Sequence, residues 1–179
     1  MRRQVGPVAV ECVKGDIVAQ PDIAAIVNAA NAQLRIGGGV AGAIHRAAGP
    51  ALAEECAPLA PIKPGQAVIT GGHALPNRYI IHCLGPVFGR DRPADTLLAS
   101  CYRQALALAE QYGIESIAFP AISTGAFSYP PAEAAAIAVG TVLDAAPQLQ
   151  AVRLIRFVLF DTASLALHRT ALTRLSDPA

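Results

Sequence analysis

The stretch that decides the fold covers residues 26–50 and reads IVNAANAQLRIGGGVAGAIHRAAGP. It begins within a short apolar run, residues 24–27, which is typical of a buried strand. A run of glycines follows at residues 37–39, and residues 40–45 have the pattern of the opening of a helix. The sequence therefore predicts a strand, a glycine-rich loop and a helix in succession.

This junction has the features of a binding site for a phosphate-bearing ligand. Glycines let the backbone approach a ligand closely and adopt a positive φ. The first turn of a helix carries unpaired N–H groups and a partial positive charge, which favour a bound phosphate. Asn28 and Asn31 follow the predicted strand, where their amides can donate and accept hydrogen bonds at the mouth of the site. A structural glycine turn without a ligand is the alternative.

A dinucleotide-binding motif is the first interpretation that the glycines invite. Gly37, Gly39 and Gly42 satisfy the pattern G-x-G-x-x-G. That motif requires the glycines directly after a strand, and an acidic residue about 20 positions later for the ribose. Here roughly nine residues separate Val27 from Gly37, and position 62 is Ile62. Both requirements fail, which argues against a nicotinamide site.

Size and charge narrow the possible classes of protein. The chain has 179 residues, of which 53% are hydrophobic, so we expect one domain over residues 1–179 with a core from about residue 8 to about 175. The formal net charge is +1 with no run of Lys or Arg, which disfavours strong or sequence-specific nucleic-acid binding. No apolar stretch has the length of a membrane span, and charged Lys14 and Asp16 come too early for a signal peptide. We expect a monomeric, cytoplasmic protein without a membrane partner.

The cysteines do not form a recognisable metal site. No C-x-x-C pair or zinc-site spacing occurs. Buried free thiols in a reducing compartment are the expected state, and neither a metal nor a cofactor is predicted. The cysteines are Cys12, Cys56, Cys83 and Cys101.

Strands and helices alternate along almost the whole predicted chain. The expected fold class is α/β, with three α/β/α layers and a mixed, largely parallel central sheet. Gly113 is expected to end the helix before it, and Asp161 or Thr162 to cap the last helix. Strands are predicted at residues 8–13, 24–27, 67–70, 78–84, 115–120 and 152–160, and helices at residues 40–56, 95–112, 131–146 and 161–175.

Asp16 and the loop at residues 85–93 can each be interpreted in two ways. Asp16 stands at a strand end, where α/β proteins bind ligands, but an N-cap or turn role fits it equally well. The loop at residues 85–93, GPVFGRDRP, is either a flap over a site or a surface excursion.

A second small-residue loop, FPAISTGAFSYP at residues 119–130, has the same order of features as the first: a strand, small polar residues, a glycine and a helix. Residues 123–126 are expected to present successive backbone N–H groups as an anion nest at a helix start. Two such loops at neighbouring strand ends suit two linked phosphates. Phe127 and Tyr129 either form an apolar wall beside a sugar or simply pack. Neither loop contains the lysine of a P-loop, which disfavours hydrolysis of nucleoside triphosphates.

Four motifs in this order, VKGDI, IVNAAN, GGGVAGAIHRAAGP and FPAISTGAFSYP, resemble the macrodomain family. The match is closest to its MacroD-like branch, which contains ADP-ribosyl hydrolases and O-acetyl-ADP-ribose deacetylases. The resemblance covers essentially the whole chain. It implies that the ligand is ADP-ribose, either free or attached to a macromolecule.

The resemblance also implies a role for each part of the site. Asp16, assisted by the backbone of Ile17, would accept a hydrogen bond from the adenine amine, and Phe160 would lie against the ring. The two small-residue loops would wrap the diphosphate. Asn31 would hold the distal ribose and place a water, which makes it the catalytic candidate, and Phe127 would pack on that sugar. With Asn28 from the strand end, the predicted site residues are Asp16, Ile17, Asn28, Asn31, Gly37, Gly38, Gly39, Val40, Ser123, Thr124, Gly125, Ala126, Phe127 and Phe160.

One departure from the family pattern bears on catalysis. The hydrolases read G-G-G-V-D-G, whereas this chain has Ala41 in place of the aspartate. Alanine has no proton acceptor, so it cannot act as a general base. Hydrolysis would then need a water held between the ligand's own phosphate and the backbone, which an oxocarbenium-like transition state permits. His45, one turn after Ala41, is either a partner in the site or a packing residue.

The sequence is therefore compatible with two functions. The first is a hydrolase that removes ADP-ribose from modified targets or deacetylates O-acetyl-ADP-ribose. The second is a reader domain that binds ADP-ribose without chemistry. The motifs favour the first, and Ala41 favours the second.

Overall fold

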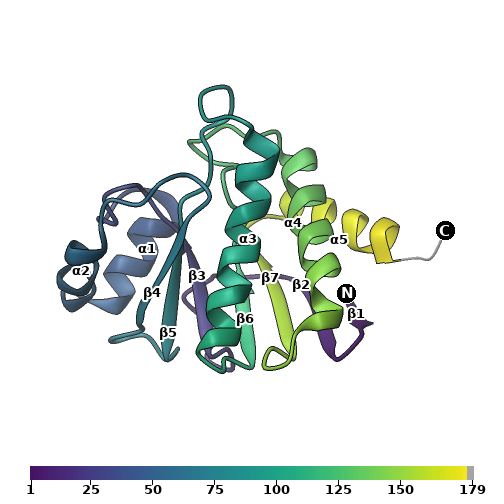
Figure 1. Ribbon diagram of the computed structural model, residues 1–179, viewed down its shortest axis with the longest axis horizontal. Helices are drawn as coiled ribbons and strands as arrows, with labels where there is room; N and C mark the ends of the chain where they lie inside the picture. Colours follow the sequence, from purple (N-terminus) through teal and green to yellow (C-terminus); the bar gives the residue numbers. More distant parts are fainter. Residues whose placement is uncertain (177–179) are drawn as a thin grey trace.

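The computed structural model describes residues 1–176, and the end of the predicted domain, residues 177–179, lies outside the described part. Strands and helices alternate along the chain (Figure 1). The strands are β1 (Arg2–Val5), β2 (Val8–Lys14), β3 (Ala25–Ala29), β4 (Ala67–Gly71), β5 (Tyr79–Cys83), β6 (Ser116–Phe119) and β7 (Leu154–Leu159). The helices are α1 (Gly39–Ala48), α2 (Ala51–Cys56), α3 (Ala94–Gln111), α4 (Pro131–Ala145) and α5 (Thr162–Ser176), with short 3-10 turns at Ala57–Leu59 and Ala146–Gln148.

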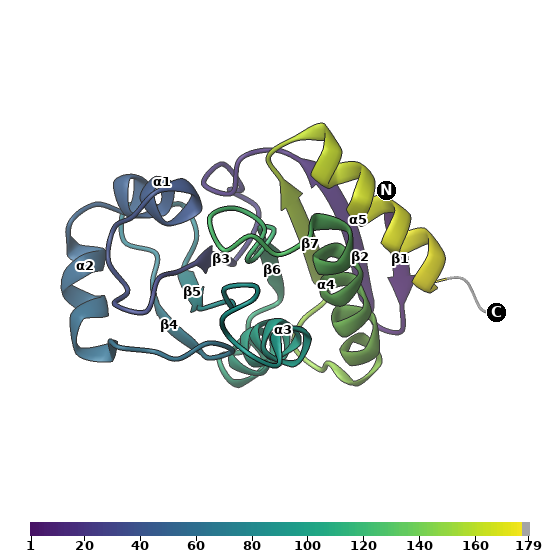
Figure 2. The same ribbon diagram turned by 90° about the horizontal axis from the view of Figure 1, so that it is seen from above.

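A seven-stranded sheet forms the centre of the fold, with the strand order β1-β2-β7-β6-β3-β5-β4. The five strands from β2 to β5 in this order run parallel, and the edge strands β1 and β4 are antiparallel to their neighbours. Helices cover both faces, and Figure 2 shows α1 and α3 on opposite sides of the sheet. The predicted three-layer fold with a mixed, largely parallel sheet is confirmed.

The two faces of the sheet pack against separate hydrophobic cores. On one face Phe119 and Phe157 stack with ring centroids 5.9 Å apart, and Tyr102 of α3 lies 5.0 Å from Phe119. Helices α4 and α5 complete this core. On the other face Ile26 of β3 and its neighbour Ile80 of β5 pack under α1 and α2. Because both faces are covered, the central strands are apolar along almost their whole length.

The helix predicted at residues 40–56 is wrong, because the chain forms two helices there, α1 and α2. Gly49 ends α1 with a φ of +89°, and its N–H donates to the carbonyl oxygen of His45 at 3.0 Å. Pro50 then precedes α2 as its N-cap. A glycine in the left-handed region followed by proline is a common helix stop, and the flanking alanines masked it in the sequence pattern.

Strand β1 was not predicted from the sequence. Its residues, RRQV, carry two arginines and no apolar alternation. It forms because β2 offers an open edge, to which Arg3 and Gln4 pair opposite Val10 and Ala9. The other predicted strands and helices agree with the structure to within two residues at each end. Gly113 follows α3 with a φ of +65°, as predicted.

No helix within residues 1–176 is long and apolar enough to cross a membrane. The longest, α3, buries one side against the sheet through residues such as Leu98, Tyr102 and Leu106. Its length is therefore explained by packing in the core.

His82 is a polar residue in the interior of β5 with no solvent exposure. Its Nδ1 lies 3.0 Å from Nδ2 of Asn28, and its Nε2 lies 2.9 Å from Oγ1 of Thr70. The Asn28 amide nitrogen can only donate, so Nδ1 accepts and the ring proton sits on Nε2. Thr70 Oγ1 accepts a hydrogen bond from this N–H and donates its own hydrogen bond to the carbonyl oxygen of Gly71. Burial and the nearby His45 lower the pKa of His82 to about 3, so the ring is neutral in the folded protein.

Stability is expected to decrease as the pH falls below 6.5, the ordinary pKa of His82. The unfolded chain binds a proton there that the folded chain excludes, and one such proton changes the free energy of unfolding by about 1.4 kcal/mol per pH unit. Urea unfolding of the wild type and of His82→Gln tests this at several pH values between about 3 and 6.5, the pKa values of His82 in the folded and unfolded chain. The variant should show a pH dependence that is shallower by about one proton. Equal slopes would contradict a neutral, buried His82.

Candidate functional site

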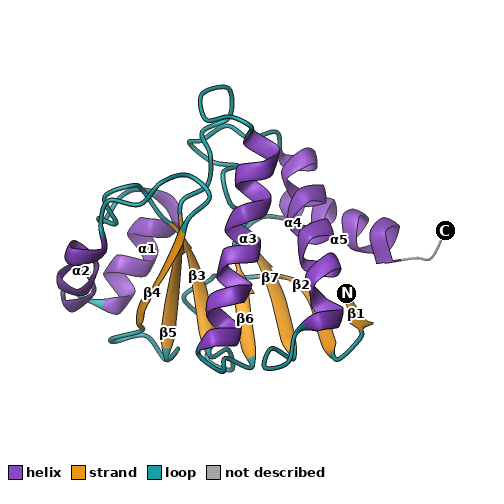
Figure 3. Ribbon diagram, viewed as in Figure 1, coloured by secondary structure: helices purple, strands orange, loops and turns teal. Residues whose placement is uncertain are grey.

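A cavity of about 750 Å³ opens at the edge of the sheet where the parallel strands end. The loops that follow β2, β3, β6 and β7 form its walls together with the first turns of α1, and Figure 3 shows loops gathered along this upper edge. Ligands of α/β proteins bind at this edge, and the volume is in the range of small-molecule sites. The lining residues are 15–17, 29–31, 37–41, 43, 46, 85, 120–127, 158, 160, 161 and 164.

The first glycine loop forms one wall of this cavity. Helix α1 begins at Gly39, and its N-cap, Gly38, provides no side-chain hydrogen bond, so the first N–H groups of the helix stay available. A side chain at position 42 would collide with the carbonyl oxygen of Gly37, so glycine is needed there to fold the loop onto α1. The predicted anion site at residues 37–40 therefore lines the cavity with its backbone.

Asn31 lines the cavity and also closes the loop before the glycines. Its Nδ2 donates to the carbonyl oxygen of Arg35 at 2.8 Å, and its Oδ1 accepts from the N–H of Arg35 at 3.0 Å. An amide has one further donor proton and one further acceptor site. Asn31 can therefore bind a ligand while it keeps the loop in shape.

The second loop, residues 120–127, forms the facing wall. Ser123 has a φ of +67°, a left-handed conformation of the kind found in backbone nests that bind anions. A side chain at position 85 would collide with Ser123 Oγ, so Gly85 lets this loop lie against the end of β5. Within residues 1–176, the buried Oγ of Ser123 has no hydrogen-bond partner.

One detail of the second loop was predicted wrongly. The nest was expected at a helix start, but α4 begins only at Pro131, after Tyr129 and Pro130. Tyr129 donates its N–H to the carbonyl oxygen of Ser123 at 2.8 Å, which closes the loop before the helix begins. An anion bound at residues 123–127 would therefore depend on the backbone N–H groups of the loop, without a helix dipole behind them.

The loop at residues 85–93 supports the second loop. Phe88 donates its N–H to the carbonyl oxygen of Phe127 at 2.9 Å, and its ring lies 4.9 Å from the ring of Tyr129. Asp91 accepts the N–H of Val87 at 2.8 Å and closes the turn. Of this loop only Gly85 lines the cavity, so the loop packs against the second loop and does not form the flap that was one of the two interpretations from the sequence.

The opposite end of the cavity carries a carboxylate and an aromatic ring. Asp16 follows β2, and its Oδ1 accepts the N–H of Val18 at 3.1 Å, which leaves the second oxygen available. Asp16 is thus both a turn residue and part of the cavity wall, together with the buried Ile17. Phe160 is 83% exposed on the same rim, which is unusual for a phenylalanine that only packs. Asp161 caps α5 by accepting the N–H of Ser164 at 2.7 Å.

Asn28 and Tyr129, both singled out from the sequence, do not line the cavity. Asn28 was expected past the strand end, but β3 extends to Ala29, so Asn28 lies inside the sheet at 1% exposure and contacts His82. Tyr129 was considered as a wall beside a sugar, but it is buried at 3% exposure. Phe127 does line the cavity.

The comparison with known families agrees with this geometry. The family model described as Macro domain matches residues 27–138. This chain belongs to the Macro domain family. A Macro domain-containing protein of Methanosarcina mazei is 58% identical to it over 130 residues, which are 72% of this chain and 69% of that protein.

Solved structures of other macrodomains have the same fold as this one. The Oceanobacillus iheyensis macrodomain with ADP superposes with a TM-score of 0.94 at 39% identity, covering 98% of this chain and 96% of that one. The Trypanosoma brucei macrodomain in complex with ADP-ribose superposes with a TM-score of 0.83 at 36% identity, covering 91% of this chain and 68% of that one.

In this macrodomain the wall formed by residues 29–46 contains no carboxylate. Ala41 lies on it at 5% exposure. The charged residue on this wall is Arg46, which sequence reasoning missed. Arg46 is one helical turn after Gly42, and its guanidinium extends back over that glycine. The spacing of four residues was the signal that could have found it.

His45, in contrast, belongs to the core of the macrodomain. It is 5% exposed and does not line the cavity. Burial lowers its pKa and favours the neutral ring. The interpretation as a packing residue fits this position better than a role in the site.

Metal-ligating side chains are dispersed in the described part of this macrodomain. Among residues 1–176 no group of three or more His, Cys, Asp or Glu side chains could hold a metal ion. The four cysteines are buried and free. Burial raises the pKa of Cys12 and of Cys56 to about 11, so both are thiols at neutral pH.

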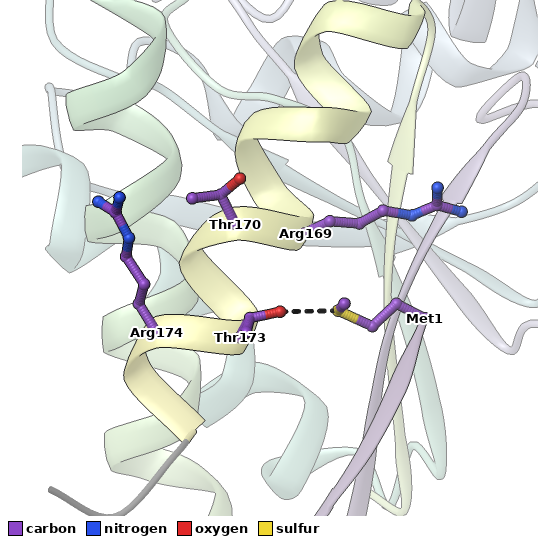
Figure 4. Close-up of a pocket in the computed structure, with 5 residues that line it drawn as sticks. All are labelled: Met1, Arg169, Thr170, Thr173 and Arg174. Atoms are coloured by element: carbon purple, nitrogen blue, oxygen red, sulfur yellow. Dashed lines mark hydrogen bonds between the residues drawn. The ribbon is translucent and has the colours of Figure 1, made fainter.

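A smaller hollow of about 320 Å³ lies between the N-terminus and the second half of α5. Thr173 Oγ1 and Met1 Sδ are 3.5 Å apart across it. The guanidinium groups of Arg169 and Arg174 extend in different directions and do not converge on one point (Figure 4). The larger cavity of the macrodomain is therefore the candidate functional site.

Gly85→Ala is expected to destabilise the macrodomain by about 1–3 kcal/mol, the usual cost of overpacking. The new methyl group would collide with Ser123 and Ile122 in the second loop. Gly125→Ala is the matched control, because a methyl group there meets no atom within 4 Å. Chemical denaturation measures both variants, and equal stability of the two would contradict the close packing of Gly85 on this loop.

Proposed function

We propose that this macrodomain binds ADP-ribose in the cavity at the strand ends. The observation that carries the proposal is the pair of backbone-lined loops, residues 37–40 and 123–127, which face one cavity. Each loop offers unpaired N–H groups, and two such loops suit two linked phosphates. The macrodomains of Oceanobacillus iheyensis and Trypanosoma brucei, whose structures hold ADP and ADP-ribose, support the same ligand here.

The distribution of charge along the cavity supports one orientation of the ligand. Asp16 and Asp161 follow the neighbouring strands β2 and β7, where they would repel a phosphate, and Arg46 belongs to α1, which packs next to β3, two strands beyond β7. We assign the adenine to the end with Asp16, Ile17 and Phe160. Its amine would donate to the free carboxylate oxygen of Asp16, and its ring would lie on the exposed face of Phe160.

The positions of the remaining groups of the ligand follow from this orientation. The diphosphate would accept hydrogen bonds from the N–H groups of the two loops. The distal ribose would then lie between Phe127 and Asn31, near Ala41 on the wall formed by α1. The carbon atom that joins ADP-ribose to a modified target belongs to this sugar, so Asn31 and Ala41 are the residues nearest to any chemistry.

Asp16→Ala is expected to weaken ADP-ribose binding by about 1.5–3 kcal/mol, the range for a hydrogen bond to a charged group. Asp144→Ala is the control, because Asp144 is an exposed carboxylate on α4 away from the cavity wall. Isothermal titration calorimetry measures both. An unchanged affinity of the Asp16 variant would refute this placement of the adenine.

A second candidate function is hydrolysis of an ADP-ribosyl linkage or of O-acetyl-ADP-ribose, as in the MacroD-like branch. One feature of the wall favours it, because Asn31 keeps one donor proton and one acceptor site free on the cavity side of the glycine loop. Departure of the leaving group carries much of the barrier at an anomeric carbon. A water held by the ligand's own phosphate is then a sufficient nucleophile. The absence of a carboxylate at residue 41 favours the alternative, a reader that only binds.

A time course with a substrate ADP-ribosylated on acidic residues separates these functions. A hydrolase should release ADP-ribose faster than the reaction without protein, and Asn31→Ala should slow the release. Ala41→Asp should raise turnover or leave it unchanged, because it adds a proton acceptor where the water is expected. Ala53→Asp, on the exposed side of α2, is the control for the added charge. Release no faster than in the reaction without protein would eliminate hydrolysis and leave the reader.

A further inference from the structure

Arg156 of β7 makes an unusually dense set of hydrogen bonds beneath the adenine end of the cavity. Its side chain is 14% exposed. Nε donates to Glu11 at 2.7 Å, and Nη1 donates to the side-chain oxygen of Gln20 at 2.9 Å. Nη1 and Nη2 donate to the two oxygens of Asp22 at 2.9 Å and 2.8 Å. Two of these three partners belong to the loop between β2 and β3, which also carries Asp16.

Gln20 links Arg156 to the backbone of Asp16. Its side-chain oxygen accepts from Arg156, and its Nε2 donates to the carbonyl oxygen of Asp16 at 3.0 Å. Gln20 is 8% exposed, so water has little access to either bond. Asp16 is therefore one side chain away from a fixed guanidinium group.

The sheet holds Arg156 in a defined position. Arg156 pairs with Glu11 across the parallel strands β2 and β7. Residues two apart in a strand lie on the same face, so Arg156 lies on the face of Val158, which lines the cavity. The loop that carries Asp16 has no helix or strand of its own. Its shape depends on side chains such as Arg156.

An arginine suits this task better than an apolar residue. A buried ion pair is weak support for stability, because desolvation offsets much of the attraction. The planar guanidinium instead fixes geometry, since it offers donors at set angles to a carboxylate and to a side-chain amide. The hydrogen bond from Arg156 also lowers the pKa of Asp22, which keeps the pair charged.

We propose that Arg156 is the positioning residue for base selection, and that it acts through Gln20 on Asp16. This inference rests on the proposed function, in which Asp16 accepts a hydrogen bond from the adenine amine. Hypoxanthine has a carbonyl oxygen where adenine has that amine, so a fixed carboxylate binds adenine and repels hypoxanthine. A carboxylate free to move can retreat from the wrong base. Loss of Arg156 therefore weakens discrimination between the bases in addition to affinity.

The test compares ADP with inosine diphosphate by calorimetry on the wild type and on Arg156→Met. The wild type should prefer ADP, and the variant should lose roughly tenfold of that preference, the equivalent of one hydrogen bond to a charged group. Arg156→Lys should recover only part of the preference, because an ammonium group cannot bind both oxygens of Asp22 in a fork. Arg153→Met, an exposed arginine just before β7 that bonds only to nearby carbonyls, should keep the full preference.

Gln20→Ala provides a second test that leaves the pairs of Arg156 with Glu11 and Asp22 in place. It should reduce the preference for ADP in the same direction, and it decides the question if Arg156→Met does not fold. An equal loss of affinity for both nucleotides, with the preference unchanged, would show a merely structural role and overturn the inference. A wild type that binds ADP without preference would overturn the inference alone. A wild type that binds neither nucleotide would overturn the proposed function itself.

Discussion

The backbone N–H groups left without partners at one edge of the sheet are the feature on which the rest of this structure depends. The loops that carry these groups are held by two close approaches of the chain, where Gly42 lies under the carbonyl oxygen of Gly37 and Gly85 lies against Ser123. A side chain at either position would displace a loop that carries the donors. Most of the residues that carry the donors, including 37–39, 125 and 126, are exposed, so a ligand that accepts several hydrogen bonds can reach the N–H groups directly.

Charge then divides the cavity into two ends. Asp16, Asp161 and Phe160 follow β2 and β7, Arg46 belongs to α1 next to β3, and the second loop follows β6 between them. An extended ligand with a negative centre and an aromatic base has only one favourable direction in such a field. The hydrogen bonds from Arg156 to Gln20, and from Gln20 to the carbonyl oxygen of Asp16, hold the backbone that carries the Asp16 carboxylate.

Most of the fold could be predicted from the sequence because the strands between β2 and β5 in the sheet are buried on both faces and read as apolar runs. The predictions of secondary structure were wrong where the local sequence pattern carries little information. Strand β1 is polar and forms only because β2 has an open edge. The break at Gly49 and Pro50 was hidden by flanking alanines that favour helix on both sides.

The sequence by itself determined the α/β class, the two small-residue loops and the loss of a carboxylate at Ala41, because these depend on residue type and local spacing. Only the tertiary structure decided that Asn28 belongs to a buried pair with His82, that α4 begins too late to support the second loop, and that Arg46 reaches the cavity. It also decided that Arg156 meets Gln20 and Asp22, which are more than 130 residues earlier in the chain. The contacts of Asn28 and of Arg156 arise when strands distant in sequence become neighbours in the sheet, and no local pattern encodes them.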